Sequence, residues 1–480
     1  METKTIERLH TFLKGEVKPV NIGISSFYEG LTSQGLDALQ LDWRPPALGN
    51  PELLRILDKL REPGIRKRIE KANDLAVKQM IAADPVLEDV APAGEVISGL
   101  EKNMVLHAGP PMVWEEMPEA IRGSVIAAVM SEGWASSPNE AAGLAESGHI
   151  DFHPGHDFDH VGGFSGVITH SMPVFVVRNR DKGNIGFSSW RDIGQASGRY
   201  NDEVLRFMKW QRERGVPVLR TALKQRGGIE LRPYLVQGIM MGDEHHNRVI
   251  GDTANFTRMF AYSIVEAAPE RRTAVELLKY FADLDLASVP INIAAAKCIV
   301  DAAKEIEYST IITAWGRNGV EDGIQISGLG NVWFNGLAPL VEGTYFPGFS
   351  QADSAPAIGD SCVIECSGFG GMASAAAPTH ATVKDAPGAA EKITRDMYEI
   401  TWSKNSRYPI PLLDSQGVPI GIDLLKVLDT GIRPVSNNPA VHKNNREISG
   451  VIGFGLTRPP MEAFEKALKA FEEKYLMLME

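Results

Sequence analysis

Cysteine, long apolar runs and basic charge are all scarce in this sequence. Its 480 residues include three cysteines, Cys298, Cys362 and Cys366, too few for a disulfide framework and without the paired C-x-x-C units of a zinc site. No uninterrupted apolar run approaches the ~18 residues that span a bilayer. Met1 to Lys14 mixes charges and lacks the apolar centre of a signal peptide. We therefore expect a cytoplasmic protein that does not enter a membrane.

Several common functional motifs are also missing. The sequence contains no P-loop, no G-x-S-x-G elbow and no H-E-x-x-H, which disfavours nucleoside triphosphatases, α/β-hydrolases and zincins. The G-x-G-x-x-G fingerprint does not follow the first predicted strand, so a dinucleotide is not expected there. With 49 basic and 61 acidic residues the net charge is −12. A chain of that balance repels a polyanion, so nucleic acid is not an expected partner.

The composition is that of a globular protein. Hydrophobic residues make up 44% of the chain and charged residues 23%, which argues against extensive disorder. A chain of 480 residues exceeds what one compact core usually holds. We expect two to four domains of mixed α/β and α+β type.

The N-terminal region predicts an α/β unit. Val17 to Phe27 predicts a buried strand that runs into a turn of small residues, and Leu36 to Leu41 predicts a second strand. The order of strand, turn, strand and helix suggests a Rossmann-like unit over residues 1–95. Apolar residues at spacings of three and four predict one buried helix face, made of Ile65, Ile69, Ala72, Ala76 and Met80.

Three further regions follow this unit. Residues 96–198 predict an α+β domain with a histidine-rich loop, and residues 199–306 a mainly helical insert. In the insert, Asn292 is expected to cap a helix that contains Cys298. Residues 307–480 predict another α+β domain, with glycine-rich loops.

An amphipathic helix is predicted at the C-terminal end. It begins after Pro459 and Pro460 and carries an apolar stripe from Met461 to Leu478. Its last turn, residues 476–479, is apolar all round. Such a turn suggests either a subunit contact or docking onto the core of the same chain.

Histidine is concentrated in a few polar loops. Imidazole exchanges protons, donates hydrogen bonds and binds metals near neutral pH, and open α/β sheets place ligands at the carboxyl ends of strands. These loops are therefore candidate ligand sites. Seven of the eleven histidines lie in or beside them: His107, His149, His153, His156, His160, His245 and His246.

The loop from His153 to His160 admits three interpretations. His153, His156 and His160, with two aspartates between them, offer enough ligands for a divalent metal. Their spacing matches no strong zinc signature, and Pro154-Gly155 rules out one continuous helix. A loop that donates hydrogen bonds to an anion, or one with a purely structural role, explains the same residues. No cofactor is predicted; a divalent metal stays open.

A second polar loop combines an acid, a base and a cation. Glu244, His245 and Arg248 lie within five residues, and a catalytic acid or base needs a neighbouring charge that tunes its pKa. The alternative is the solvated start of a helix, because Asp243 after Gly242 suits an N-cap.

Two loops of the last region are further candidates. Arg317 and Asn318 follow a predicted strand, where a guanidinium can grip a carboxylate or phosphate, although a polar turn explains them equally. Asp360 lies in a Gly-Asp-Ser turn ahead of Cys362 and Cys366. Neither cysteine has a histidine near it in sequence, so two small buried thiols are favoured over a nucleophile.

These loops, in this order, resemble the YlbE-like family. The family is encoded beside FdrA-type proteins, and the resemblance covers roughly Leu41 to Pro378. It implies a Rossmann-like N-terminal unit, two α+β domains, a small helical insert and a subunit of oxamate carbamoyltransferase, which converts oxalurate and phosphate into oxamate and carbamoyl phosphate. The segments that carry it are Asp42 to Ala47, Leu106 to Pro111, Met241 to Arg248, Arg317 to Gly319 and Ile358 to Ser361.

Carbamoyl transfer requires a site that holds two anions and stabilises a developing oxyanion. We expect Arg317 and Arg248 to clamp the anions, His107 and His156 to donate to the oxyanion or carry protons, and His245 or Glu244 to protonate the leaving nitrogen. The candidates for substrate contact are Arg248, Arg317, Asn318, Asp360, His160 and Gly109.

The expected partners are a small anionic ureide, phosphate, an FdrA-type subunit and further copies of the chain. Two alternatives remain. One is a metal-dependent amidohydrolase that uses the His153 to His160 loop. The other is a non-catalytic scaffold whose partners do the chemistry.

Overall fold

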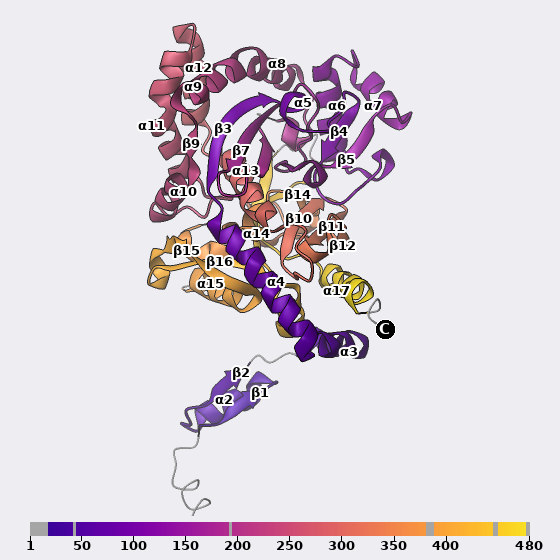
Figure 1. Cartoon of the computed structure of the whole chain (residues 1–480), viewed down its shortest axis with the longest axis vertical. Coiled ribbons are helices and arrows are strands. Elements are labelled where there is room, and N and C mark those ends of the chain that lie inside the picture. Colours follow the sequence, from indigo (N-terminus) through magenta and orange to yellow (C-terminus); the bar gives the residue numbers. More distant parts are fainter. Residues whose placement is uncertain (1–17, 42–44, 192–193, 381–387, 445–449, 477–480) are drawn as a thin grey trace, which may run out of the picture.

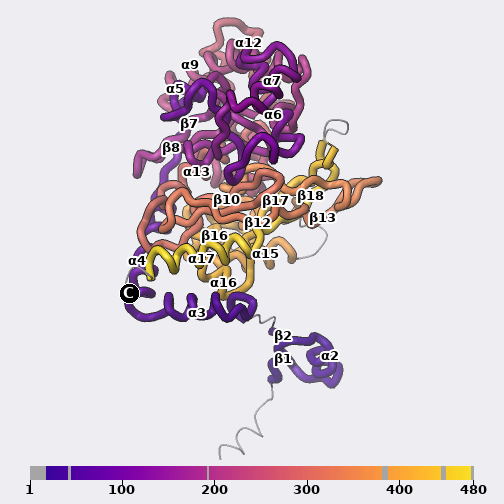
Figure 2. Tube along the Cα trace, turned by 90° about the vertical axis from the view of Figure 1, so that its right-hand side faces the viewer, coloured from indigo at the N-terminus to yellow at the C-terminus, as the bar shows by residue number. Residues whose placement is uncertain are grey.

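The computed structural model describes residues 18–41, 45–191, 194–380, 388–444 and 450–476. Figures 1 and 2 show an upper part built from the first half of the chain and a lower part built mainly from the second half, with a small N-terminal unit below both. Two large hydrophobic cores hold the body together. One draws residues from Ala47 to Tyr475, and the other from Ala93 to Met208. The predicted domain boundaries stay predictions.

The N-terminal unit contains two short parallel strands joined by a helix. These are β1 (Val20–Ile22), α2 (Ser25–Ser33) and β2 (Leu39–Leu41). The strand predicted to reach Phe27 ends at Ile22, and Ser25 already begins α2. The larger Rossmann-like sheet expected over residues 1–95 is not confirmed, because among the described strands β1 and β2 pair only with each other. The predicted Asp42 to Ala47 motif lies partly outside the described residues.

Two helices then enter the body. Asn50 caps α3 (Pro51–Leu60), its side chain accepting hydrogen bonds from the backbone of Glu52 and Leu53. The next helix, α4 (Pro63–Ala82), crosses the lower part diagonally (Figure 1). It buries the face that the apolar spacing predicted, Ile65, Ile69, Ala72, Ala76 and Met80.

The upper part is built on a five-stranded sheet in the order β6-β8-β7-β3-β9. Its strands are β3 (Pro85–Pro92), β6 (His160–Val161), β7 (Pro173–Asn179), β8 (Ile185–Ser189) and β9 (Ile229–Glu230). Beside it lies a lobe with the parallel pair β4 (Met104–His107) and β5 (Asp151–Pro154). The helices of this lobe are α5 (Ala93–Val96), α6 (Glu119–Glu132) and α7 (Pro138–Glu146).

A run of helices packs around this sheet (Figure 1). The run comprises α8 (Asp202–Trp210), α9 (Val216–Arg226), α10 (Leu231–Met240), α11 (Ile250–Ala267), α12 (Arg271–Asp283) and α13 (Val289–Val300).

Helix α13 lies at the centre of the molecule, and all twelve of its residues are buried. It packs so closely on β8 that a Cβ on Gly186 would lie 2.4 Å from the carbonyl oxygen of Ala294. The predicted cap at Asn292 is wrong, because the helix already begins at Val289. Asn292 therefore lies inside the helix, with its amide free to bond to other segments.

The lower part contains three antiparallel sheets. The first is β12-β11-β10-β14, from β10 (Ile312–Asn318), β11 (Glu321–Ile326), β12 (Phe334–Leu337) and β14 (Ile358–Gly359). The second is β13 (Glu342–Tyr345), β18 (Val451–Thr457) and β17 (Ser436–Val441), and the third β15 (Thr401–Ile410) and β16 (Gln416–Ile422). The accompanying helices are α14 (Val363–Cys366), α15 (Ala389–Ile400), α16 (Leu424–Thr430) and α17 (Met461–Tyr475).

Helix α17 docks onto the core of its own chain. Phe464, Leu468 and Phe471 are fully buried, and Tyr475 is 6% exposed. The hypothesis that the last turn makes a subunit contact concerns residues 476–479, of which 477–479 lie outside the described part of the chain.

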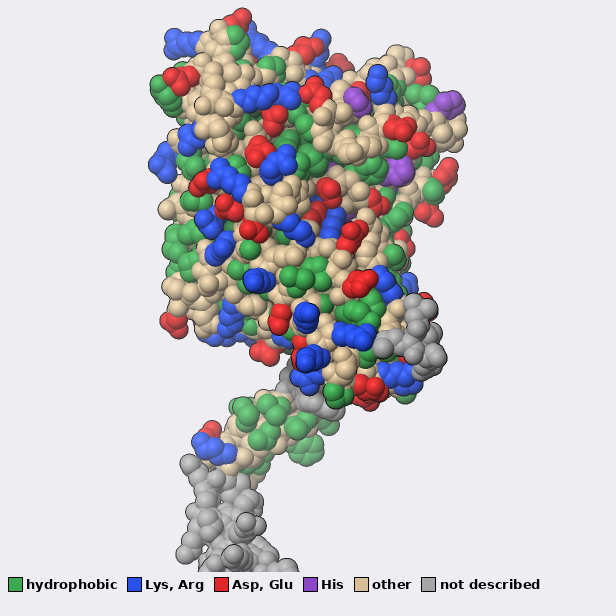
Figure 3. Space-filling view, in the orientation of Figure 1, with side chains coloured by type: hydrophobic (Ala, Val, Ile, Leu, Met, Phe, Trp, Pro, Cys, Tyr) green, Lys and Arg blue, Asp and Glu red, His purple; other side chains and the backbone are tan. Residues whose placement is uncertain are grey.

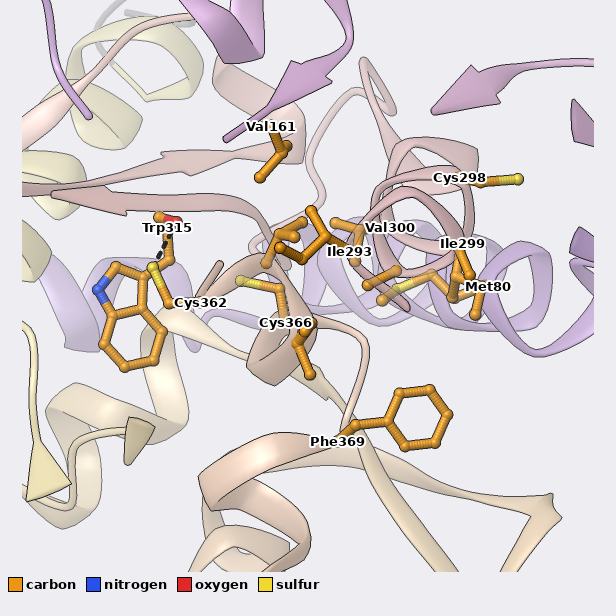
Figure 4. Close-up of a cluster of buried hydrophobic side chains, with 14 of the residues drawn as sticks. Met80, Val161, Ile293, Cys298, Ile299, Val300, Trp315, Cys362, Cys366 and Phe369 are labelled. Atoms are coloured by element: carbon orange, nitrogen blue, oxygen red, sulfur yellow. Dashed lines mark hydrogen bonds between the residues drawn. The ribbon is translucent and has the colours of Figure 1, made fainter. Parts of the chain in front are cut away.

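The three cysteines are small buried residues rather than reactive thiols. Figure 4 shows Cys362 and Cys366 among apolar side chains around α13, with the Cys362 thiol directed at the carbonyl oxygen of Trp315. Burial raises the pKa of all three thiols, including that of Cys298 on α13. A thiolate nucleophile is therefore disfavoured.

The surface shows charges of both signs scattered over the face in Figure 3. The histidines visible there gather on the lobe of β4, β5 and α7. No helix in the described ranges is both long and apolar enough to cross a bilayer.

Candidate functional site

Three of the predicted loops meet at the end of strand β10. Strand β14 pairs with β10 so that Gly359 lies opposite Arg317. The backbone N–H of Gly109 donates to Asp360 Oδ1 at 2.6 Å, and the Asn318 amide donates to the carbonyl oxygen of Pro110 at 3.1 Å. Segments more than 200 residues apart in sequence are thus held within hydrogen-bond distance of one another.

Gly109 makes this close approach possible. Its φ is +78°, and a Cβ there would lie 2.5 Å from the Asn318 nitrogen and 2.6 Å from the Arg317 carbonyl carbon. We expect Gly109→Ala to lower the free energy of unfolding by about 2–5 kcal/mol, from left-handed strain and overpacking together. Denaturant unfolding measures this loss. Gly133→Ala is the matched control, because Gly133 has a φ of +76° and open space around its Cβ position. A loss no larger than that of the control contradicts the close packing.

Arg317 is a fully buried cation held by neutral groups. Its guanidinium donates to Thr457 Oγ1 at 2.7 Å, to Asn438 Oδ1 at 3.3 Å and to the Gly359 carbonyl at 3.4 Å, and it lies 5.7 Å from the Trp315 ring centroid. It takes part in none of the ion pairs among the described residues. Its positive charge is therefore available to attract an anion nearby.

The second polar loop is locked by its own side chains. The Glu244 carboxylate accepts the backbone N–H groups of Asn247 at 2.6 Å and Arg248 at 2.8 Å. The Arg248 guanidinium donates to Asp243 Oδ1 at 2.6 Å, and Asp243 Oδ2 accepts the Asp252 N–H at the start of α11. Glu244 and Arg248, both predicted to act on substrate, thus fix the shape of the loop.

The side chain of the neighbouring residue His245 points toward helices α11 and α13. Its Nδ1 lies 2.7 Å from Asp252 Oδ2, and Asn292 on α13 donates to that same oxygen at 2.8 Å. Burial would lower the pKa of His245, but the Asp252 carboxylate raises it, and the net shift is upward. Within the described part of the chain, the Nε2 atom of His245 has no hydrogen-bond partner.

His246, one residue further, completes a serine–histidine–glutamate chain. Its Nε2 lies 2.8 Å from Ser361 Oγ, and its Nδ1 lies 2.8 Å from Glu365 Oε1. His246 and Glu365 are buried, whereas Ser361 is partly exposed. This is the order of contacts in which a carboxylate orients an imidazole and the imidazole takes the proton of a hydroxyl.

The electrostatics of His246 suit a general base. Burial would lower its pKa, but Glu365 and then Glu244 raise it, and the pKa lies above the usual 6.5. A base of this kind is stronger than free imidazole. Neither its contact with Ser361 nor that with Glu365 was predicted from the sequence, although both loops were.

Ser361 and His246 line a small pocket of about 30 Å³. A second pocket of similar size shares part of its wall, namely Phe164, Arg191, Val289 and Gly163. The Arg191 guanidinium lies 5.5 Å from the centroid of the Phe164 ring. The remaining lining residues of the first pocket are Asn247, Leu286, Ile358, Asn438 and Pro439.

The predicted site residues lie behind this pocket rather than in its wall. None of the ten predicted catalytic and substrate-binding residues lines it, but several adjoin a residue that does. Asp360 precedes Ser361 and His245 precedes His246 in the chain, while Arg317 bonds to Asn438.

The histidines of the loop from His153 to His160 have separate environments. His156 Nδ1 lies 3.2 Å from the buried Lys297 ammonium, and His160 Nε2 lies 2.9 Å from Ser189 Oγ. His153 is partly exposed and packs against Phe158. No three potential ligands gather closely enough to hold a metal ion anywhere in the described ranges.

A buried polar centre adjoins the pocket. Burial raises the pKa of Asp360 to about 8 and lowers that of His107 to about 4, so both are neutral at pH 7. Burial also lowers the pKa of His156, whose ring meets Trp333 edge-on at 5.5 Å. Asp360 Oδ2 and the Nε2 atoms of His107 and His156 have no hydrogen-bond partner among the residues that the structure describes. Such groups are suited to hydrogen bonding with a polar ligand or water.

Larger cavities lie elsewhere. One of about 470 Å³ is lined by Lys392, Arg433 and Arg458 beside helices α15 and α16. It contains none of the residues discussed above. The concentration of buried titratable groups argues for the smaller pocket as the chemical site.

The fold and pocket together define a mixed α/β protein with a small pocket lined by both polar and apolar side chains. Its family follows from known proteins. The family described as oxamate carbamoyltransferase subunit AllG matches residues 150–361. The chain is 36% identical over 412 residues to oxamate carbamoyltransferase subunit AllG of Escherichia coli (strain K12), covering 84% of this chain and 98% of that protein. The chain therefore belongs to the AllG family.

Two further relatives have no stated function. Uncharacterized protein YahG of Escherichia coli (strain K12) is 38% identical over 462 residues, which cover 95% of this chain and 97% of that protein. A crystal structure of a conserved protein of unknown function from Enterococcus faecalis V583 is 37% identical, with a TM-score of 0.83 over 85% of this chain and 98% of that one. The mixed α/β architecture is thus also found in a solved relative.

Proposed function

We propose that this chain is a subunit of a carbamoyltransferase that acts on a small anionic ureide. The reaction is phosphorolysis of oxalurate, which gives oxamate and carbamoyl phosphate. The observation that carries the proposal is the pocket lined by Ser361, His246 and Arg191. The buried Arg317 donates a hydrogen bond to Asn438, which also lines this pocket. Membership of the AllG family supports the choice of the carbamoyl group.

The charge around the pocket fits an anionic substrate. A carboxylate in the pocket would be attracted by the guanidinium of Arg191 and by the charge of Arg317. His246 is available to take or return a proton at the ureide nitrogen. The neutral Asp360 acid, next to Ser361, can donate a hydrogen bond without repelling the anion.

An assembly is part of the proposal. The AllG relative is described as a subunit, and we propose that this chain works with an FdrA-type partner and with further copies of itself. Exposed apolar side chains of the N-terminal unit support a contact surface (Figure 3). They are Val20, Ile22, Ile24, Phe27 and Leu39.

The amidohydrolase alternative receives less support. It needs His153, His156 and His160 around one metal, but these histidines contact Phe158, Lys297 and Ser189, respectively. The scaffold alternative would leave the contacts among Ser361, His246 and Glu365 without a function, which weakens it.

The proposal is tested by assembling the chain with its partner subunits and measuring carbamoyl phosphate formation from oxalurate and phosphate. We expect Arg191→Ala to raise KM for oxalurate about 10–100-fold, because a hydrogen bond to a charged group contributes ~1.5–3 kcal/mol. Arg180→Ala is the matched control, since Arg180 forms a surface ion pair with Glu230. No turnover by the complete assembly, or an unchanged KM in Arg191→Ala, contradicts the proposed substrate.

A further inference from the structure

We infer that Ser361 is a nucleophile, activated by His246 and Glu365, that carries the transferred acyl group covalently between donor and acceptor. The identity of that group as carbamoyl rests on the proposed function; the activation of Ser361 does not. The inference stands on two contacts of 2.8 Å, Ser361 Oγ to His246 Nε2 and His246 Nδ1 to Glu365 Oε1.

Local structure holds the three side chains in place. Ser361 and Glu365 lie four residues apart around the short helix α14, so both face the same side, and the imidazole of His246 bridges them. Glu365 Oε1 also accepts the Gly371 N–H at 3.0 Å. Glu244 fixes the backbone at His246 by accepting its N–H at 3.3 Å. The imidazole therefore has little freedom to rotate away from the serine.

Burial divides the roles within the chain of contacts. The Glu365 side chain is fully buried and that of His246 is 4% exposed, whereas Ser361 is partly exposed and lines the pocket together with His246. A carboxylate removed from water interacts strongly with the imidazolium that forms as the serine loses its proton. The partly exposed Ser361 hydroxyl is therefore the member of the three that is placed to meet a substrate.

Two other serine–histidine contacts lack these features. Ser189 Oγ lies 2.9 Å from His160 Nε2, but burial lowers the pKa of that imidazole to about 3, which leaves it a weak base. Ser147 Oγ lies 2.7 Å from His149 Nδ1 on the exposed surface. Neither histidine contacts a carboxylate in the described structure. Ser361 differs from these two serines because it combines a histidine base, a buried carboxylate that contacts this histidine, and a pocket.

Transfer of the carbamoyl group through Ser361 takes two steps. His246 Nε2 takes the proton of Ser361, and Oγ attacks the carbamoyl carbon of the ureide. The bond from that carbon to the ureide nitrogen breaks, the nitrogen takes the proton from His246, and oxamate leaves. A carbamate ester remains on Ser361. An oxygen of hydrogen phosphate then attacks the same carbon and gives its proton to His246. The bond from that carbon to Ser361 Oγ breaks, His246 passes the proton to Oγ, and carbamoyl phosphate departs.

A fluorophosphonate reagent tests the nucleophile on the full chain alone, followed by peptide mass spectrometry. We expect one phosphonylated residue, Ser361, no labelling there in Ser361→Ala, and a rate at least ~100-fold lower in His246→Ala. Ser147→Ala is the matched control and should be labelled at the wild-type rate. Absence of label on Ser361, or labelling undiminished in folded His246→Ala, overturns the inference.

The transferred group is identified in the assembled enzyme. Acid quenching during turnover of oxalurate should leave a carbamoyl group on the Ser361 peptide. Full turnover by Ser361→Ala overturns the covalent step even where the proposed reaction stands. Conversely, fluorophosphonate labelling of Ser361 together with no turnover of oxalurate rejects the proposed substrate and retains the nucleophile, so the two failures are distinguishable.

Discussion

Replacing His246 by alanine is expected to lower kcat of the assembled enzyme about 10³–10⁴-fold. The imidazole is within 2.8 Å of both the Ser361 hydroxyl and the Glu365 carboxylate, so its removal abolishes proton transfer at the pocket. It contributes little to the hydrophobic cores, and the loop keeps the contacts of Glu244 with Asn247 and Arg248. The variant should fold and still bind its partners.

Steady-state formation of carbamoyl phosphate measures this effect, and circular dichroism verifies the fold. His149→Ala is the control, because His149 lies exposed on the surface beside Ser147. A loss of less than tenfold in His246→Ala would mean that the proton is transferred elsewhere in the site.

The same residue sets the expected pH dependence. Transfer requires neutral His246, whose pKa lies above 6.5 because Glu365 and Glu244 outweigh the opposing effect of burial. The rate of the wild type should therefore rise with pH through that pKa. Glu365→Gln removes a negative charge, so its acid limb should move to lower pH, and its maximal rate should fall.

The loops of this site were predictable from the sequence, but the directions in which their side chains point were not. Of the pair His245 and His246, His245 was the predicted catalytic residue. His245 adopts a φ of +74°, which turns the backbone so that the two imidazoles point to different segments. One meets Asp252 and the other Glu365. A pattern of residue types carries no information about such a turn.

Long-range contacts explain the other omissions. Glu365 approaches His246 across 119 residues, and Arg191 reaches the pocket from the end of β8. The four-residue spacing of Ser361 and Glu365 was visible, yet a spacing of four is functional only when a third group bridges it. Composition, helix periodicity and turn residues are local signals, and they predicted the α/β character, α4 and α17 better than the site.

The spacing of histidines in the sequence also did not predict their positions in the folded chain. His153, His156 and His160 suggested a shared ligand because they are close in sequence. In the structure a 3-10 turn from Gly155 to Phe158 separates them, and Asp159 follows it with a φ of +54°. Their rings contact three different neighbours. The three histidines are therefore close in sequence but do not share one ligand site in the folded chain.

Asp360→Asn is expected to make the stability of the protein less sensitive to pH. Burial raises the pKa of Asp360 from 3.8 to about 8 in the folded chain. Between those values the folded state holds a proton that the unfolded state has lost, so this group makes the free energy of unfolding fall as pH rises from ~4 to ~8. The asparagine variant cannot titrate there. Its amide oxygen can still accept the Gly109 N–H that Asp360 Oδ1 accepts at 2.6 Å.

The measurement is the difference in free energy of unfolding between variant and wild type at pH 5, 6, 7 and 8. We expect this difference to grow in favour of Asp360→Asn by about 2–4 kcal/mol from pH 5 to pH 8. Asp58→Asn, at an exposed residue of α3, should show little change over the same range.

A difference that stays constant with pH would mean that Asp360 is already ionised in the folded protein, with the nearby Arg317 as its counter-charge. That outcome would also alter the proposed chemistry. An ionised Asp360 would repel an anionic ureide bound beside Ser361, whereas a neutral acid can donate a hydrogen bond to it. The pH dependence of stability therefore decides whether this side chain attracts or opposes the substrate.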